Sequence, residues 1–199
     1  MTEAKKTLLE LAGADLTPPT MREACLVLID VQNEYRAGPI AVVGADAAIE
    51  RAQRLLAAAR RAQAPVFHIA HRGRSGGLFD RDAERGQIVA ALAPIDGEAV
   101  IEKTLPNSFA KTDLQARVAA AGRTNLILAG FMTHMCVSST ARAALDLGLR
   151  VAVEAAACGT RDLPDGRGGI IPAATVHEVA LAELADRFAI VVRTEQALV

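Results

Sequence analysis

Residues 24–71 decide the fold: they read ACLVLID at 24–30, ADAAIERAQRLLAAARRAQ at 45–63 and PVFHIAH at 65–71. The first and third segments are nearly continuous apolar runs, which is typical of strands buried on both faces. The middle segment repeats apolar residues at helical spacing, and the proline that follows it stops a helix. The stretch therefore predicts a strand, a helix and a second strand parallel to the first.

The same alternation continues along the rest of the chain. We expect further strands at 99–103, 125–130, 149–157 and 188–193, helices at 80–92, 112–122, 134–147 and 173–186, and a loop at 161–171. Strands that are apolar on both sides need helices over both faces of their sheet. The sequence therefore predicts an α/β fold, a three-layer doubly wound sandwich with a six-stranded, mainly parallel sheet. Residues 1–20 lie outside this rhythm, so we expect an N-terminal extension followed by one domain at 21–199.

The composition indicates a globular protein that acts on a small molecule. Of 199 residues, 51% are hydrophobic, which fits a single well-packed domain. The net charge is -1 and only 3% of residues are aromatic, so neither a basic field nor a base-stacking surface points to nucleic acid. No apolar stretch has the length of a membrane span, and the N-terminus lacks a signal-peptide pattern. Three cysteines outside any spaced framework favour a reducing compartment, so we expect a cytoplasmic protein.

Reactive side chains close several of the predicted strands. Asp30 follows the first strand, His71 ends the second and Lys103 ends the third. Cys136 lies six residues beyond the end of the fourth, near the start of a helix. Ligands of doubly wound sheets bind beyond the carboxyl ends of the strands, so we expect these groups to meet at one edge.

Carboxylate, ammonium and thiol together can perform nucleophilic catalysis. The thiolate is the reactive form of cysteine, and a helix N-terminus and a nearby Lys103 would both favour that anion. Asp30 could accept the thiol proton and later donate it to a leaving amine. Taken singly, each residue has a plainer interpretation: Asp30 as a cap, Lys103 as a solvated charge and Cys136 as a small core residue.

Five segments resemble one family. They read IDVQNEY (29–35), EKTLPNSF (102–109), GFMTHMCVSSTARAALDLG (130–148), AACGTRDLP (156–164) and HEVALAELADRFAIVV (177–192). They resemble the isochorismatase-like, or nicotinamidase-related, cysteine hydrolases, and the resemblance runs from about residue 22 to the end of the chain. It is specific for the superfamily and says little about the substrate.

The resemblance implies roles for particular residues. Cys136 would be the nucleophile, Asp30 the acid and base, and Lys103 their electrostatic partner. The amides of Met132 and Cys136 would form an oxyanion hole, with a cis peptide between Phe131 and Met132. No cofactor is implied, and members of the family commonly assemble, so we expect a homo-oligomer, either a dimer or a tetramer.

Other residues near the predicted edge are candidates for contact with substrate: Tyr35, His71, Asn107, Phe131 and His134. For Asn107 a role in a turn is the alternative, and for His134 a helix cap. Nicotinamidases carry a histidine-rich metal site after the second strand. Here His68 and His71 are three apart on a strand and point to opposite faces, so we expect no metal and disfavour nicotinamidase activity.

Several features have mainly structural interpretations. Among the loop arginines Arg72, Arg74 and Arg161, one could pair with a substrate carboxylate, although most such arginines are solvated. The glycine-rich stretch 73–77 could be a mobile lid. Arg142 is expected to make a structural or subunit contact. Cys25 and Cys158 are expected to be buried and inert.

Three functions remain open from the sequence. The first is hydrolysis of the C–N bond of a small amide, ureido or carbamoyl compound through a thioester at Cys136. The second is vinyl-ether hydrolysis of the isochorismatase type, in which Asp30 acts as an acid and no thiol is needed. The third is a non-catalytic protein that binds a metabolite or a partner.

Overall fold

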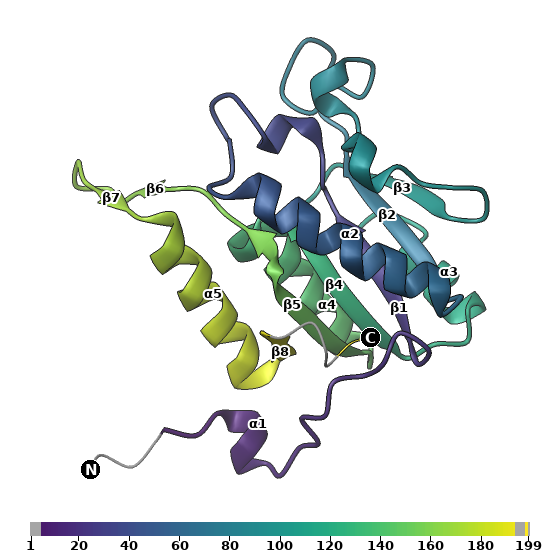
Figure 1. The fold of residues 1–199 in the computed structure, drawn as a ribbon. Coiled ribbons are helices and arrows are strands. Elements are labelled where there is room, and N and C mark those ends of the chain that lie inside the picture. Colours follow the sequence, from purple (N-terminus) through teal and green to yellow (C-terminus); the bar gives the residue numbers. More distant parts are fainter. Residues whose placement is uncertain (1–4, 194–197, 199) are drawn as a thin grey trace.

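The computed structural model describes residues 5–193 and Leu198, and a six-stranded sheet forms its centre (Figure 1). The sheet has the order β3-β2-β1-β4-β5-β8, and every neighbouring pair is parallel. Its strands are β1 (Ala24–Ile29), β2 (Val66–His71), β3 (Ala99–Lys103), β4 (Asn125–Phe131), β5 (Arg150–Gly159) and β8 (Ile190–Val192). The predicted α/β sheet is confirmed.

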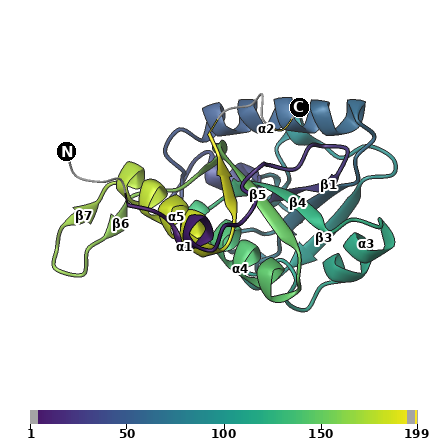
Figure 2. The same ribbon diagram turned by 90° about the horizontal axis from the view of Figure 1, so that it is seen from below.

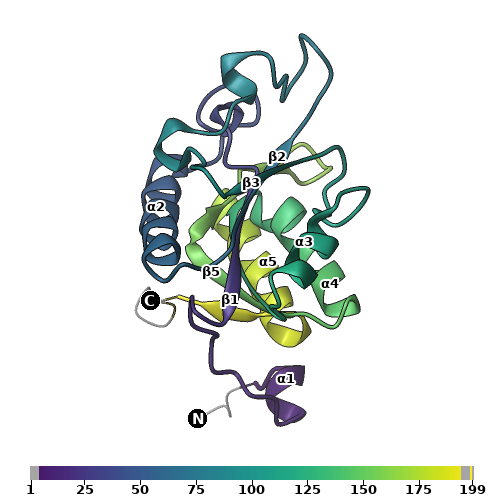
Figure 3. The ribbon, with the colours of Figure 1, turned by 90° about the vertical axis from the view of Figure 1, so that its right-hand side faces the viewer.

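Helices cover both faces of the sheet (Figure 3). One face carries α2 (Ala45–Arg61), and the other carries α3 (Leu114–Ala120), α4 (Ser138–Asp146) and α5 (Ala173–Arg187). Alternate residues of β1 pack into the cores on the two faces of the sheet, because successive side chains of a strand point to opposite faces. Leu26 and Leu28 belong to the core beneath α2, whereas Val27 and Ile29 belong to the core beneath the other three helices.

Two predicted elements differ from the structure. The expected helix at 80–92 is replaced by two short 3-10 turns, η2 (Glu84–Gly86) and η3 (Ala90–Leu92). The reason lies partly in Asp80, whose carboxylate accepts hydrogen bonds from the amides of Gly76 and Asp82 and so stabilises a loop in place of a helix. The expected helix at 134–147 begins as a five-residue π turn, η4 (Thr133–Val137), before α4.

The expected loop at 161–171 contains a small antiparallel hairpin, formed by β6 (Leu163–Pro164) and β7 (Ile170–Ile171). It projects from the body just before α5 (Figure 1). Its strands are only two residues long, too short for period-two alternation to reveal them in the sequence. A single 3-10 turn, η1 (Asn33–Tyr35), follows β1.

The N-terminal segment lies against the far end of the domain. Its helix α1 (Leu8–Leu11) is beside α5 (Figure 2), and the amide of Leu8 donates to Asp186 at 2.9 Å. Arg150 holds the following stretch through the carbonyls of Asp15 and Thr17. The division between residues 20 and 21 stays a prediction. Over the described part of the chain no helix is long and apolar enough to cross a membrane.

Candidate active site

Topology brings the predicted reactive residues together. Strands β1 and β4 are neighbours, and the chain leaves them for opposite faces of the sheet, through α2 and α4. The crevice beyond their carboxyl ends is the usual ligand site of such a sheet. Asp30 directly follows β1, and Cys136 lies in the turn after β4. Lys103 ends β3, and its long side chain reaches Asp30.

Asp30, Lys103 and Cys136 form one contiguous buried cluster. The ammonium Nζ of Lys103 is 2.6 Å from Oδ2 of Asp30 and donates to Sγ of Cys136 at 3.3 Å. The exposed fractions of the three residues are 0%, 2% and 3%. Asp30 also has a φ of 51°, a left-handed conformation that costs energy outside glycine and that is concentrated at functional sites.

Burial dominates the electrostatics of this cluster. It raises the pKa of Asp30, against the opposing effects of Lys103 and of hydrogen bonds from Lys103 and Cys136. Burial, together with the negative charge of Asp30, raises the pKa of the Cys136 thiol to about 12, although Lys103 acts in the opposite direction. Lys103 favours the thiolate, as expected, but burial and the charge of Asp30 have the larger effect and favour the protonated thiol.

The turn that carries Cys136 is η4, and residues from two other elements hold it. The hydroxyl of Thr133 is 2.9 Å from Nδ1 of His177 on α5. Nδ1 of His134 is 2.6 Å from the hydroxyl of Thr160, which follows β5. The peptide between Phe131 and Met132, immediately before this turn, is cis, as the resemblance implies.

An aromatic wall adjoins the cluster. The ring of Tyr35 lies 5.2 Å from that of Phe79 and 5.5 Å from that of Phe131, measured between centroids. His71 is 5.0 Å from Phe79, and its Nδ1 accepts from Lys103 Nζ at 3.4 Å. Among these four residues only Phe79 was missed by sequence reasoning. The signal for it was an apolar Leu78–Phe79 pair at the end of a glycine-rich loop.

Asn107 occupies a turn, the alternative considered for it. Its Oδ1 accepts from the amide of Phe109 at 2.9 Å. The neighbouring Ser108 is fully buried, and its amide donates to the hydroxyl of Thr140 on α4. These bonds connect the segment after Lys103 to the helix that follows Cys136.

Two buried polar residues after β1 were also missed. The side chain of Gln32 accepts from the amide of His71 and donates to the carbonyls of His71 and Gly86. Glu34 accepts from the amide of Phe79 at 2.8 Å. Both fix the backbone of the aromatic wall. The signal for them was that polar residues directly follow a fully buried strand. Polar side chains buried at such a place need hydrogen-bond partners.

The loop arginines differ in their surroundings. Arg72 pairs with Glu102 on the surface. The carbonyl of Arg74 accepts from the amide of Gly77 within the same loop. Arg161 is half-buried: one of its amino groups donates to the carbonyl of Asp162, whereas its buried Nε lacks a partner among the described residues. Its charge lowers the pKa of His134, after the larger effect of burial, and also acts on Tyr35.

The remaining candidates have structural contacts. Arg142 bonds Ser138 and Glu183 and lies over the ring of Phe188, so it joins α4 to α5. His68 is buried and contacts Glu98 at 2.8 Å. Cys25 and Cys158 are buried, and burial raises their pKa values to about 11 and about 12.

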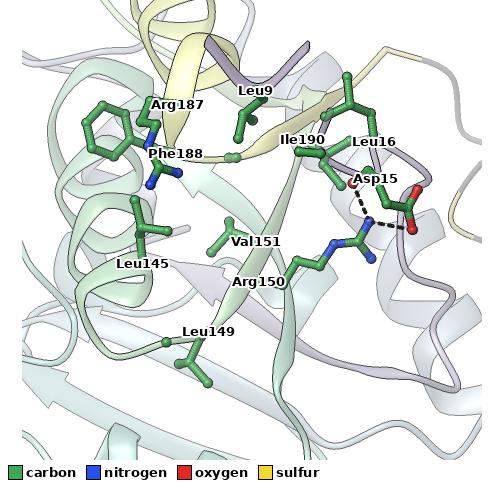
Figure 4. Close-up of a pocket in the computed structure, with 13 residues that line it drawn as sticks. Leu9, Asp15, Leu16, Leu145, Leu149, Arg150, Val151, Arg187, Phe188 and Ile190 are labelled. Carbon is green, nitrogen blue, oxygen red and sulfur yellow. Dashed lines mark hydrogen bonds and ion pairs between the residues drawn. The ribbon is translucent and has the colours of Figure 1, made fainter. Parts of the chain in front are cut away.

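Two further observations concern metal ligands and a pocket elsewhere in the protein. Within the described residues, no group of three or more His, Cys, Asp or Glu side chains is arranged to hold a metal ion. A pocket of about 350 Å³ lies beneath the N-terminal segment, lined mainly by apolar residues and also by Asp15, Arg150 and Arg187 (Figure 4). Arg150 begins β5, so this pocket is at the amino end of that strand, opposite the edge that carries Asp30 and Cys136.

Comparison with known proteins identifies the family and agrees with the fold. The family model described as Isochorismatase domain matches residues 24–196. The crystal structure of an isochorismatase from Pseudomonas putida KT2440 superimposes with a TM-score of 0.94 at 41% identity, covering 98% of this chain and 100% of that one.

Two curated relatives are each 36% identical. The Secreted isochorismatase effector Isc1 of Verticillium dahliae matches over 93% of this chain and 95% of its own length. Streptothricin hydrolase of Streptomyces noursei matches over 84% of this chain and 62% of its own length. The extent of the family match and the level of identity lead to one conclusion: this chain belongs to the isochorismatase family of hydrolases.

Proposed function

We propose that this protein is a cysteine hydrolase that cleaves the C–N bond of a small amide, ureido or carbamoyl compound through a thioester at Cys136. The observation that carries the proposal is the contact of one ammonium with both other groups, 2.6 Å to Asp30 and 3.3 Å to Cys136. A thiol without a suitable base is a poor nucleophile, and a buried carboxylate without a cation is unstable. Here Asp30 is the proposed base for the thiol of Cys136, and Lys103 is the cation that accompanies the buried Asp30 carboxylate.

The raised pKa values fit a proton transfer that occurs only when substrate is bound. The proton of the Cys136 thiol passes to the Asp30 carboxylate as sulfur attacks the carbonyl carbon. Lys103 stabilises the negative charge that leaves Asp30 and develops on sulfur. The amides of Met132 and Cys136 are the proposed donors to the carbonyl oxygen as it becomes an oxyanion.

Collapse of this intermediate breaks the C–N bond. The amine leaves with the proton held by Asp30, whose raised pKa suits it to act as an acid. Water then attacks the thioester, Asp30 accepts its proton, and the acid is released as Cys136 regains a proton. The tyrosine, phenylalanine and histidine side chains of the aromatic wall are the proposed boundary of the substrate. His134 is a further proposed contact.

The names of relatives support amide chemistry. Besides streptothricin hydrolase, they include a maleamate amidohydrolase of Pseudomonas putida at 28% identity and Nicotinamidase 3 of Arabidopsis thaliana at 27%. Each of these names describes that relative's own activity. What they share is hydrolysis on this fold, and the cysteine at position 136 is the group through which an amide would be cleaved here.

The direct test is release of ammonia or amine from a panel of carboxamides, ureido acids and carbamoyl amino acids. We expect turnover by the wild type and none by Cys136→Ala, with unchanged unfolding curves. A thioester trapped at Cys136 would give the mass of the acyl half. Full activity of Cys136→Ala on any amide in the panel would rule out the thioester route.

Arg161 supports a narrower proposal, that the preferred substrates carry a carboxylate. Arg161 is half-buried, its Nε has no partner among the residues that the structure describes, and its charge acts on Tyr35 and His134, so it is suited to donate hydrogen bonds to an anionic group. We expect Arg161→Gln to raise KM about 10- to 100-fold for acidic amides, the equivalent of a charge-assisted hydrogen bond, and to leave neutral amides unchanged. Arg72→Gln is the control, because that arginine is already paired with Glu102.

The name of the family favours one rival, vinyl-ether hydrolysis. In that reaction Asp30 donates a proton to the substrate and Cys136 is dispensable. Isochorismate, assayed with the wild type, Cys136→Ala and Asp30→Asn, separates the two: only the rival predicts activity that survives loss of the cysteine. A non-catalytic binding protein would turn over neither isochorismate nor any amide.

A further inference from the structure

We infer that His177 on α5 is a positioning residue for the nucleophile: its hydrogen bond to Thr133 holds the turn that presents Cys136. The inference rests on the proposed function, because it assigns a task within that same site. Nδ1 of His177 and Oγ1 of Thr133 are 2.9 Å apart. Thr133 is the first residue of η4, and Cys136 is three residues later in the same five-residue turn.

The conformation of this turn calls for support from outside it. A π turn is rare in proteins, occurs mostly as a single turn, and is common at functional sites. Here it joins β4 to α4, and Cys136 must lie within contact distance of Lys103. A displacement of about 1 Å at a reacting group can reduce a rate about 100-fold. Small changes in the path of the turn would therefore matter more for catalysis than for folding.

Packing alone does not fill the space on this side of the turn. A cavity of about 240 Å³ is lined there by His177, Thr160, Cys158 and Val43, together with the first residues of α5. Further along α5, Leu181 and Leu184 are fully buried against the sheet. The end of the helix nearest the turn thus makes a polar contact beside a cavity, whereas Leu181 and Leu184 make apolar contacts with the core.

The two polar contacts act on adjacent residues. Thr133 is held by α5, and His134 is held by Thr160 after β5. Thr133 and Thr160 are buried, at 0% and 2% exposure, so each hydroxyl needs its partner. Burial also lowers the pKa of His177, so its ring is neutral near neutral pH and Nδ1 can share this bond with a hydroxyl. The contact between α5 and η4 therefore depends on one particular hydrogen bond, between Thr133 and His177.

The test uses variants that keep or remove one hydrogen-bonding atom. Thr133→Val removes the hydroxyl with little change of shape, and His177→Leu removes the imidazole. His177→Asn restores a polar atom at the position of Nδ1, and is expected to rescue. The control is Glu183→Gln, which removes the other polar contact of α5 to the segment after Cys136, its exposed pair with Arg142.

On any amide that the wild type hydrolyses, we expect Thr133→Val and His177→Leu to lower kcat about 10- to 100-fold, with KM changed less than about twofold. The double variant should be no slower than the slower single variant, because both remove one interaction. His177→Asn should recover most of kcat, and Glu183→Gln should match the wild type. Equal kcat in the wild type and Thr133→Val, which retains the fold, would overturn the inference.

A second measurement needs no substrate. Iodoacetamide labelling, followed by peptide mass, gives the reactivity of Cys136 relative to Cys25 and Cys158 in the same molecule. We expect this ratio to exceed one in the wild type, because Asp30 can accept the Cys136 proton and Lys103 can stabilise the thiolate as sulfur attacks the reagent. It should fall about tenfold in Thr133→Val and His177→Leu, since sulfur would lose its alignment with Lys103. An unchanged or higher ratio in these variants contradicts the positioning role alone. A wild-type ratio of one contradicts the proposed function, and the inference with it.

Discussion

The ammonium of Lys103 and the carboxylate of Asp30 lie 2.6 Å apart, and both side chains are completely closed off from solvent. Burial of either charge alone would cost several kcal/mol even after relaxation, so each charge is tolerated in the interior because the other compensates it. The pair joins the ends of β1 and β3, which are separated in the sheet by β2. Stability and chemistry therefore depend on the same contact.

Removal of one partner should destabilise the protein strongly. Lys103→Met leaves the buried Asp30 carboxylate unpaired, and we expect the free energy of unfolding at neutral pH to fall by about 3–5 kcal/mol. The double variant Asp30→Asn, Lys103→Met contains no buried charge at this point and should recover much of the loss. Urea unfolding of the three proteins measures both effects. A single variant as stable as the wild type would mean that the pair is solvated in solution.

Asp30→Asn should have opposite effects on the acidity of the thiol and on catalysis. The negative charge of Asp30 is one cause of the raised pKa of Cys136, so its removal should lower that pKa, and the thiolate should form at a lower pH. Turnover should nevertheless be abolished, because no group remains to accept and return the proton. Ultraviolet absorbance of the thiolate against pH gives the first result, and amide hydrolysis gives the second.

The corresponding control is Asp30→Asn combined with Cys136→Ala. Burial also raises the pKa values of Cys25 and Cys158, so the absorbance that remains in this double variant belongs to them. A titration of Cys136 that moves to higher pH in Asp30→Asn would contradict the electrostatic account of the site.

The sequence alone was sufficient to predict the strands and the residues at their ends, because these follow directly from the pattern of apolar residues. Nearly continuous apolar runs predicted the six strands, and the end of a parallel strand is the place for Asp30 and Lys103. It failed for segments whose conformation depends on side-chain hydrogen bonds. Asp80 stabilises a loop where spacing predicted a helix, and the β6–β7 hairpin is too short to leave a pattern.

The balance of effects on the pKa of Cys136 could not be read from the sequence either. Lys103, which was expected to favour a thiolate, does contact the sulfur. Its effect on the pKa is outweighed by burial and by the charge of Asp30, and both depend on packing distances that cannot be read from a motif. Likewise, no pattern linked His177 to Thr133, because these residues are 44 positions apart and on different elements. The oligomeric state and the cytoplasmic location stay predictions, and one relative is described as secreted.

The half-buried residue Glu98 should make stability depend on pH. Burial raises the pKa of Glu98, but hydrogen bonds from Arg60, His68 and the amide of Ile95 outweigh it and lower the pKa to about 2. Because this pKa is lower than in the unfolded chain, the contribution is complete above the unfolded value near 4.5 and is lost as pH falls toward about 2. We expect Glu98→Gln to cost about 2–3 kcal/mol at neutral pH and nothing at the acid end of this range.

Thermal unfolding of the wild type and Glu98→Gln across this pH range measures the difference. Glu102→Gln is the control: Glu102 also pairs with arginines, but on the surface, where such pairs contribute about 0–1 kcal/mol. A pH-independent difference between the wild type and Glu98→Gln would show that shape, and not charge, explains the loss.

Gly130 should be intolerant of any side chain, because β4 approaches β1 closely just below Asp30. A Cβ atom at Gly130 would lie 2.0 Å from the carbonyl oxygen of Ile29, and the residue has a φ of 128°. Backbone atoms of two neighbouring strands cannot move apart without loss of the hydrogen bonds between the strands, so we expect Gly130→Ala to cost about 3–5 kcal/mol in urea unfolding.

Gly122→Ala provides the comparison: its φ is 65°, but a Cβ there meets no atom within 4 Å. It should cost only the left-handed conformation, about 1 kcal/mol. Equal losses in the two variants would mean that backbone conformation, and not the contact with Ile29, requires glycine at this position.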